Sequence, residues 1–567
     1  MKIFSLQFKS KKRENFSLYL LVFLLSLLFF GYFQLTPTLA DPDSFYHAKT
    51  ALLIKNQGII KEFPWLQYTI LKDNYIDHHL LYHILLVPFL IFFSPLIGIK
   101  IAVVIFSSLS VLFFYWLLKK FKISYPFLYI FLLLTSAPWL FRLNLAKAQP
   151  LSLIILFLSV YFLFQKKYLY LFLISFIYVW TYNGWPLIII WLFSYLLAYF
   201  IHQIYFSEEN YLKKITHLLP FKKKTNGLKK IAYYFYKTIK ENKYSLLSVF
   251  GGIIAGIIIN PYFPKNLFFY WVHIFKIGVI NQAEKLHAGV EWYPYPGREF
   301  IYGTITILVI WIFSFIWYSE RFKKKSVKTL SLGIFSLFFF LYTLKSRRNI
   351  EYFIPFALLF TAFSLKDFWL SVNWLEFGEK IKETFFQGKK RFLSSLLATY
   401  LILFSLFFVA NYFVKGIKEV RNELANGFPL TKFQKSAEWL EKNTPKHSLI
   451  FHSCWTDTPF LFYYNTHNYY LVGLDPTFMY QYNKELFWQW LNITQGNPPL
   501  TYPYSEKIKE NKEKFNYDLA KIIKKNFRSS YVFINKDHPA MKENIEKNKK
   551  FKLIYQDKEA TIYQIEE

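Results

Sequence analysis

The chain is poor in cysteine and in acidic residues. Its 567 residues include one cysteine, Cys454, and 36 acidic residues against 68 basic ones, so the formal net charge is +32. A single cysteine excludes a fold held together by intramolecular disulfides. Only 19 glycines are present, which excludes collagen, and the apolar content described next excludes an intrinsically disordered chain.

Apolar residues dominate the composition. Hydrophobic residues make up 54% of the chain, aromatic residues 22% and charged residues only 18%. A soluble globule cannot bury so much apolar surface, so most of it must face lipid. A hydrocarbon core about 30 Å thick needs roughly 20 apolar residues per helix. About eleven runs meet or approach this length, and they begin near residues 16, 97, 125, 150, 168, 185, 245, 301, 329, 352 and 395.

The basic residues follow the alternation of these runs. Six basic clusters fall on one side of the membrane if the N-terminus is inside, as the positive-inside rule requires. They are Lys9–Arg13, Lys119–Lys122, Lys166–Lys167, Lys213–Lys243, Lys323–Lys325 and Lys389–Arg391. The sequence therefore predicts a polytopic α-helical protein of the plasma or inner membrane with a cytoplasmic N-terminus. Much of the net charge is then a topology signal, and we expect no nucleic-acid partner.

The N-terminal run has a second interpretation. Thr38-Leu39-Ala40, directly before Asp41, has the small residues of a signal-peptidase site. However, the apolar stretch at 16–35 is about 20 residues long, whereas the apolar region of a signal peptide has about 7–15. We therefore expect a retained membrane anchor.

Two loops and the C-terminal region are predicted on the outer face. The loops, at about 37–95 and 261–300, belong to a transmembrane domain predicted at 1–415. At 416–567 the hydrophobic period changes, and short β-branched and aromatic runs alternate with helical ones. We expect an extracytoplasmic α/β domain there, with helices at 436–442 and 484–493 and strands at 448–452, 531–534, 551–555 and 561–565.

Two acidic residues directly follow the first predicted span. Asp41 and Asp43 are two positions apart, so they can hold a divalent cation, or one can act as a base beside a second charge. The alternative is a turn that ends the helix, because Asp and Pro are common in turns. An acidic pair against the bilayer is unexpected in so basic a chain, and this favours a functional role.

Histidines lie later in the first outer loop. His79 and His83 are four residues apart at the start of an apolar run and therefore share a helix face. This spacing suits a metal or a pair that contacts phosphate, and we assign His79 to phosphate and His83 to the metal. The alternative is an interfacial helix with its polar residues at the headgroups.

Glu291 and an arginine pair lie in later outer segments. Glu291 stands among the aromatic residues of 290–296, where it can bind hydroxyls or a metal, or form a salt bridge in an aromatic belt. Arg347 and Arg348 break the positive-inside pattern, and a guanidinium pair can clamp phosphate through forked hydrogen bonds. The alternative is that they extend to the headgroups or pair with Glu351.

Carboxylates, a phosphate clamp and aromatic loops on one face suit transfer from a polyprenyl-linked phosphate donor. Arginine or a cation stabilises the leaving phosphate, and a carboxylate accepts a proton from the acceptor. The alternatives are a flippase or transporter of lipid-linked glycans and a non-catalytic membrane scaffold. A transporter needs polar or broken helices near the midplane, whereas the polar residues here gather at the outer ends. A scaffold leaves the acidic pair and the arginine pair unexplained.

The layout resembles the catalytic subunit of oligosaccharyltransferase, within the GT-C class of membrane glycosyltransferases. The resemblance in plan covers most of the chain. Asp43 or Asp41 resembles the catalytic acid of the family's first outer loop. Glu291 in Val-Glu-Trp resembles its metal-side glutamate, and Arg347 or Arg348 resembles the arginine of its late span. The resemblance implies a polyprenyl-linked sugar donor in the membrane lipid.

Two departures from the family concern its metal and its acceptor. Where the family has a second acidic motif, this chain reads Arg142–Gln149 without an acid. The implied Mn²⁺ or Mg²⁺ would be held by Asp43, Glu291 and His83, or the protein would be metal-independent. Trp455-Thr456-Asp457 resembles a shortened form of the Trp-Trp-Asp-Tyr-Gly acceptor motif. Trp455 and Asp457 are thus the implied acceptor-binding residues, for a glycan, a lipid or a protein.

Overall fold

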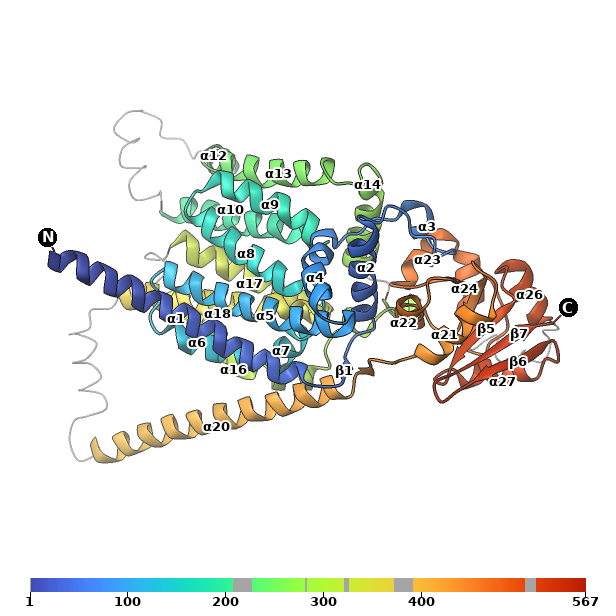
Figure 1. The fold of residues 1–567 in the computed structure, drawn as a ribbon. Helices are drawn as coiled ribbons and strands as arrows, with labels where there is room; N and C mark the ends of the chain where they lie inside the picture. The colour runs from blue at the N-terminus through green and yellow to red at the C-terminus, as the bar shows by residue number, and fades with distance from the viewer. Residues whose placement is uncertain are drawn as a thin grey trace.

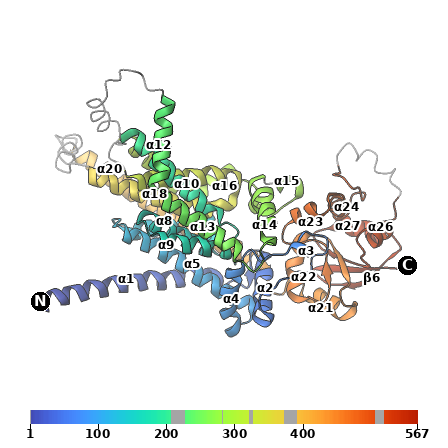
Figure 2. The same cartoon turned by 90° about the horizontal axis from the view of Figure 1, so that it is seen from above.

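The computed structural model describes residues 2–206, 227–280, 283–320, 326–371, 391–504 and 517–566. A helical body adjoins a smaller α/β domain (Figure 1). The N-terminal end of α1 lies at the end of the body far from this domain, and Figure 2 shows the same separation from a second direction. The predicted basic clusters at Lys222–Lys224, Lys323–Lys325 and Lys389–Lys390 lie outside the described residues.

All eleven predicted apolar runs coincide with helices. Proline at the first position begins several of them, because its fixed φ suits the first helical turn. After α6 the chain bends by 84° into the short helix α7 (Ala137–Leu143). The eleven helices are α1 (Lys2–Gln34), α5 (Pro95–Lys120), α6 (Pro126–Leu134), α8 (Gln149–Phe164), α9 (Tyr168–Thr181), α10 (Pro186–Phe206), α13 (Lys243–Ile258), α16 (Gly297–Glu320), α17 (Val327–Lys345), α18 (Ile350–Ser371) and α20 (Arg391–Ala425).

Several of these helices can cross a membrane. Among the residues described, α1, α5, α10, α16 and α17 are the 5 that are long and apolar enough, and α6 with α7 makes a sixth if the bent pair is one span. The apolar helices α4 (Leu80–Phe92), α8, α9 and α13 are shorter, at 10–17 residues. The predicted polytopic helical body is thus confirmed, while the number of spans, about eleven, stays a prediction.

Basic residues gather at the end of the body that lies away from the α/β domain. Lys366 Nζ donates a hydrogen bond to Phe121 O at 2.6 Å. Lys328 Nζ lies 5.3 Å from the centre of the Phe121 ring and 5.7 Å from that of Phe164. The ends of α5, α8 and α18 and the start of α17 therefore meet there. The cytoplasmic position of this end stays a prediction.

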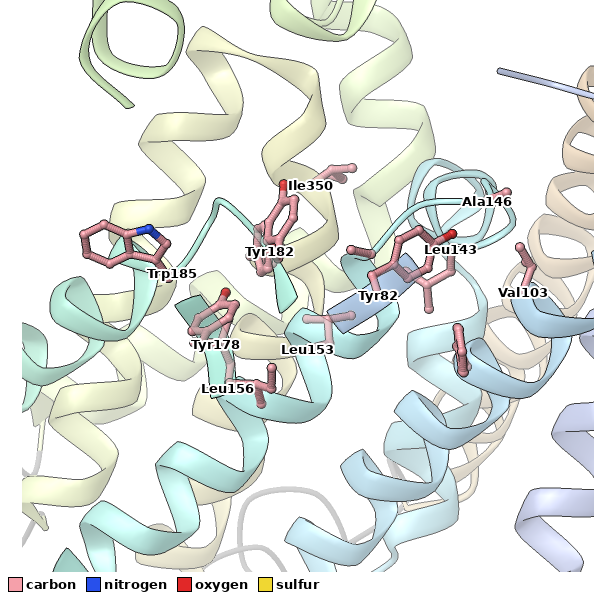
Figure 3. Packing of buried hydrophobic residues seen from close by; sticks show 14 of the residues in the cluster. Tyr82, Val103, Leu143, Ala146, Leu153, Leu156, Tyr178, Tyr182, Trp185 and Ile350 are labelled. Atoms are coloured by element: carbon pink, nitrogen blue, oxygen red, sulfur yellow. The ribbon is translucent and has the colours of Figure 1, made fainter. Parts of the chain in front are cut away.

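Side chains from several helices pack beneath the opposite end of the body. Figure 3 shows Tyr82 of α4, Leu153 of α8 and Tyr178 of α9 in one buried cluster. The hydroxyls of Tyr178 and Tyr352 lie 2.5 and 3.0 Å from Ser152 Oγ. Buried hydroxyls that are paired in this way avoid the cost of unsatisfied polar groups. The loops at this end therefore rest on a well-packed base.

The C-terminal domain is built on a 5-stranded mixed sheet with the order β4-β3-β5-β7-β6. The predicted strands are β3 (Leu449–His452), β5 (Tyr531–Asn535), β6 (Phe551–Gln556) and β7 (Ala560–Ile565), and the predicted helices are α21 (Gln434–Asn443) and α24 (Lys484–Thr494). β3 runs parallel to β4 (Tyr469–Tyr470) and β5, whereas β7 is antiparallel to β5 and β6. The predicted α/β architecture is confirmed.

The first outer loop is joined to this sheet. Leu66 forms a parallel bridge with Tyr470 of β4. The helix that begins at the acidic pair, α2 (Asp43–Gln57), packs on α22 (Thr458–Tyr464), and the rings of Phe45 and Phe460 lie 4.7 Å apart. The α/β domain is therefore held against the segment that carries Asp41 and Asp43.

A short antiparallel ladder directly precedes the acidic pair. β1 (Thr38–Leu39) pairs with β2 (Phe428–Pro429), which follows α20. Gly427 approaches this segment so closely that a Cβ there would lie 2.6 Å from Leu39 O and 2.9 Å from Ala40 Cα. The path of the backbone into Asp41 thus depends on a residue without a side chain at position 427.

Gly427→Ala is expected to push away the backbone of Leu39 and Ala40. Overpacking of this kind usually lowers the free energy of unfolding by about 1–3 kcal/mol. Gly31→Ala in α1 is the control, because a Cβ there meets nothing within 4 Å. Thermal unfolding of the two purified variants measures the difference, and equal melting temperatures would show that the contact at Gly427 relaxes without cost.

Candidate active site

A cavity of about 1160 Å³ lies between the helical body and the α/β domain. Its wall includes five of the residues predicted from the sequence: Asp41, Asp43, Glu291, Arg347 and Trp455. Much of the remaining wall comes from α7, α16 and α20, including Pro138, Phe141, Tyr302, Gly303, Tyr412 and Val420. The structure therefore brings the acidic pair, the loop glutamate and one arginine into a shared space.

The three carboxylates converge on Lys147. Its Nζ lies 2.7 Å from Asp41 Oδ2, 3.0 Å from Asp43 Oδ2 and 3.4 Å from Glu291 Oε2. The lysine side chain is only 9% exposed. Although burial opposes ionisation, the three carboxylates raise the pKa of Lys147 above its ordinary value. Lys147 is thus a permanent buried cation at the centre of the site.

Arg142 connects Glu291 to the core of the helical body. Its Nη1 lies 2.6 Å from Glu291 Oε2, and its Nε lies 3.0 Å from Glu351 Oε2 in α18. Burial opposes ionisation of Glu291, but Lys147, Arg348 and Arg142 hold its pKa well below the usual range. Glu291 is therefore a fixed anion that cannot accept a proton near neutral pH.

Asp43 and Asp41 differ in their surroundings. Asp41 Oδ1 accepts a hydrogen bond from Asp43 N at 2.8 Å, while its Oδ2 binds Lys147. The Asp43 side chain is 32% exposed against 15% for Asp41, and its Oδ1 has no hydrogen-bond partner in the described part of the chain. Burial raises the pKa of Asp43 to about 6, with Lys147 opposing the shift. Asp43 is thus ionised at neutral pH and suited to accept a proton.

The two predicted phosphate-clamp arginines have different surroundings. Arg347 lines the cavity; its Nη2 donates to Pro294 O at 3.0 Å, and its buried Nε has no partner among the residues described. Arg348 Nη2 instead donates to Tyr182 Oη at 3.0 Å, and its Nη1 lies 3.4 Å from Glu291 Oε1. Arg347 therefore keeps donors for a ligand, whereas Arg348 holds Glu291 in place.

The structure does not bring the predicted histidines into the cavity wall. His83 Nδ1 lies 2.7 Å from Asp77 Oδ2, and His83 Nε2 lies 2.7 Å from His47 Nδ1, so both of its ring nitrogens are engaged. His79 stacks on Tyr182, with the ring centres 5.4 Å apart. These histidines form a buried layer between α2 and α4, apart from the carboxylates.

The carboxylates do not fit a divalent metal. Within the described ranges, no group of three or more His, Cys, Asp or Glu side chains is placed to hold one. Asp41, Asp43 and Glu291 share a centre, but Lys147 Nζ lies there. His83, the predicted third ligand beside Asp43 and Glu291, is engaged elsewhere. An ammonium and a dication repel each other strongly at such short range, so Mn²⁺ or Mg²⁺ does not fit beside Lys147.

The predicted acceptor residues also differ from each other. Trp455 lines the cavity where the α/β domain meets the helical body. Asp457 is buried behind it, where Oδ1 accepts from Asn535 Nδ2 at 2.6 Å and Oδ2 accepts from Ser453 Oγ at 2.9 Å. Burial raises the pKa of Asp457 to about 6. Asp457 therefore braces its own loop, and the acid that this domain presents to the cavity is Asp475.

Arg142, Lys147 and Glu351 are outside the site residues predicted from the sequence. The absence of acids from 142–149 indicates an incomplete metal site but does not by itself indicate what replaces the acids. A usable signal exists, because basic residues are rare in outer loops, and the same rule singles out Arg347 and Arg348. Applied to Arg142 and Lys147, it would have marked both.

The comparison with solved structures finds matches that include an archaeal oligosaccharyltransferase. AglB, the archaeal oligosaccharyltransferase from Archaeoglobus fulgidus, in complex with an inhibitory peptide and a dolichol-phosphate, aligns with TM-score 0.60 and 12% identity, over 92% of this chain and 70% of that chain. The apo form of the Archaeoglobus fulgidus oligosaccharyltransferase aligns with TM-score 0.53 and 11% identity, over 93% of this chain and 71% of that chain. ArnT from Cupriavidus metallidurans bound to undecaprenyl phosphate aligns with TM-score 0.49 and 11% identity, over 96% of this chain and 97% of that chain.

No model of a protein family matches the sequence, and the search of curated proteins found no match. Identities of 11–12% concern the fold alone. At that level the resemblance drawn from the sequence is confirmed: the chain has the fold of the archaeal oligosaccharyltransferase, with an α-helical membrane body and a C-terminal α/β domain.

Proposed function

We propose that this chain is a membrane glycosyltransferase. It moves a sugar or oligosaccharide from a polyprenyl-phosphate-linked donor to an acceptor at the extracytoplasmic face. The observation that carries this proposal is that Asp43 and Arg347 line one cavity, a carboxylate with a pKa of about 6 and a guanidinium whose Nε has no partner among the described residues. The likeness to an oligosaccharyltransferase that binds a dolichol-phosphate and an inhibitory peptide supports a lipid-linked donor and a separate acceptor.

The shape of the cavity suits an amphiphilic donor. Its helical side, from α7, α16 and α20, combines apolar and aromatic residues such as Phe141, Tyr302 and Val420 with charged ones, whereas its other walls carry Asp43, Glu291 and Arg347. α16 is apolar enough to cross a membrane. A polyprenyl tail would lie along the apolar and aromatic residues of this side, with its phosphate at Arg347, because apolar contacts suit the tail and a guanidinium suits the phosphate.

In the proposed reaction Asp43 accepts a proton from the acceptor nucleophile as that nucleophile attacks the anomeric carbon. The bond between the anomeric carbon and the phosphate oxygen breaks, and the bonding pair leaves with the phosphate. Arg347 stabilises the negative charge through its free N–H groups. The acceptor is a glycan, a lipid or a protein, and it approaches past Trp455 and Asp475 from the side of the α/β domain.

The two alternative functions account for less of this arrangement. A transporter of lipid-linked glycans needs polar groups along a path at mid-membrane depth. Here the charged groups surround one cavity beside the α/β domain. A non-catalytic scaffold has no need of an arginine whose donors are left free in a cavity wall.

Asp43→Asn removes the proposed base and keeps the shape of the side chain. We expect transfer to fall by about 10²- to 10⁴-fold. In the wild type, the rate should fall as the pH drops below about 6, because protonated Asp43 cannot accept a proton, and the Asn variant should lack this limb. Asp518→Asn, at a surface ion pair with Lys550, is the control. An unchanged rate in Asp43→Asn would remove Asp43 from the mechanism.

Arg347→Ala is expected to raise KM for the lipid-linked donor by about 10- to 100-fold, the value of one lost charge-assisted contact. KM for the acceptor should stay within error of the wild type. Arg298→Ala is the matched variant, since Arg298 lines the same cavity. Initial rates measured with each substrate varied in turn give the two KM values. A larger change in KM for the acceptor than for the donor would contradict the assignment of the phosphate to Arg347.

The donor and the acceptor can be identified in cells that lack this chain. Mass spectrometry of lipid-linked glycans and of surface glycoconjugates should show an accumulated donor and a missing product, which together identify both substrates. Unchanged profiles of both classes would contradict the proposed function.

A further inference from the structure

We infer that Lys147 is a built-in substitute for a divalent cation, so that the carboxylate site is assembled and works without a bound metal. What this substitution means for catalysis rests on the proposed transferase function. The geometry around Lys147 and the metal-binding test do not depend on that function. The inference joins three observations: the position of Nζ, the carboxylates that surround the ammonium, and the balance of charge around it.

The first observation is the position of Nζ. It lies between the three carboxylates, 2.7–3.4 Å from one oxygen each of Asp41, Asp43 and Glu291. These separations suit N–H···O hydrogen bonds, whereas Mg²⁺ binds oxygen at about 2.0–2.1 Å. A metal could enter this centre only by expelling a side chain that is 9% exposed.

The second observation is that carboxylates surround the ammonium of Lys147. An ammonium has three N–H groups, and three carboxylates surround this one. The ion pairs of Nζ hold it between the carboxylates, whereas a catalytic metal keeps open coordination positions for a ligand. Lys147 is therefore a positioning residue that holds Asp43 toward the cavity, and the charge of the leaving phosphate falls to Arg347.

The third observation is the balance of charge. Four carboxylates, from Asp41, Asp43, Glu291 and Glu351, are paired with three cations, from Lys147, Arg142 and Arg348. One negative charge remains among these paired groups, so most of the carboxylate charge that would attract a dication is already compensated. Removal of Lys147 would leave three carboxylates around an empty centre, and this arrangement would suit a hard divalent cation.

The test measures Mn²⁺ binding by the full chain in lipid nanodiscs, using electron paramagnetic resonance and the melting temperature. The wild type is expected to bind no Mn²⁺ at these carboxylates and to melt at the same temperature with and without it. Lys147→Ala should melt at a lower temperature, bind one Mn²⁺ per chain and regain stability when Mn²⁺ is added. Lys147→Arg keeps the charge and should bind none.

Two controls locate the acquired ion. Lys432 is also 9% exposed, and among the described residues its ion pair is with one carboxylate, that of Glu559 at 3.4 Å, so Lys432→Ala should gain no Mn²⁺. The double variant Lys147→Ala with Glu291→Gln should lose the Mn²⁺ that Lys147→Ala acquires.

In transfer assays, ethylammonium should restore activity to Lys147→Ala and not to Lys147→Met, where methionine fills the space.

Stoichiometric Mn²⁺ on the wild type that disappears in Glu291→Gln would overturn the inference. A folded Lys147→Ala that binds no Mn²⁺ would also overturn it. If Lys147→Ala does not fold, the wild type and Glu291→Gln still decide the question. If the Mn²⁺ results are as expected but the wild type transfers no sugar, the proposed function alone is refuted. If EDTA abolishes the activity of the wild type and Mn²⁺ restores it, the inference alone is refuted.

Discussion

The buried ammonium of Lys147 is the interaction on which the outer end of this molecule depends. Carboxylates from the segment after α1 and from the loop before α16 repel each other and cannot be buried together without a compensating cation. By binding Asp41, Asp43 and Glu291, Lys147 joins three distant parts of the chain at one point. Electrostatic compensation therefore adds to the packing of Phe45 on Phe460 and to the β1–β2 ladder in fixing where Asp43 lies.

The cations of the site divide into two groups with different work. Lys147, Arg142 and Arg348 are engaged by carboxylates and hold the framework, whereas Arg347 keeps donors for a ligand. The framework extends to the α/β domain through the β1–β2 ladder and through the bridge between Leu66 and β4. The wall contributed by this domain is thus tied to the acidic pair, and both sides of the cavity form one unit.

The sequence singled out several residues that line the cavity but not Lys147, which lies among the carboxylates. Asp43, Glu291 and Arg347 were expected in one pocket because each is a polar residue placed against the bilayer, and the structure brings them to one cavity. A helix-face argument joined His79 and His83, but spacing does not reveal partners, and His83 pairs with Asp77 and His47 instead. The catalytic and binding roles of Asp43, Glu291 and Arg347 stay predictions.

The sequence by itself determined the membrane body, the helical runs and the strands of the C-terminal domain. Hydrophobic period and length are local properties, and each segment carries its own signal. Only the tertiary structure decided that Lys147 takes the centre of the carboxylates, that Arg348 faces Glu291 while Arg347 faces the cavity, and that Asp457 is turned inward. Ion pairs between distant segments depend on how the helices and domain pack, and no local pattern encodes that geometry.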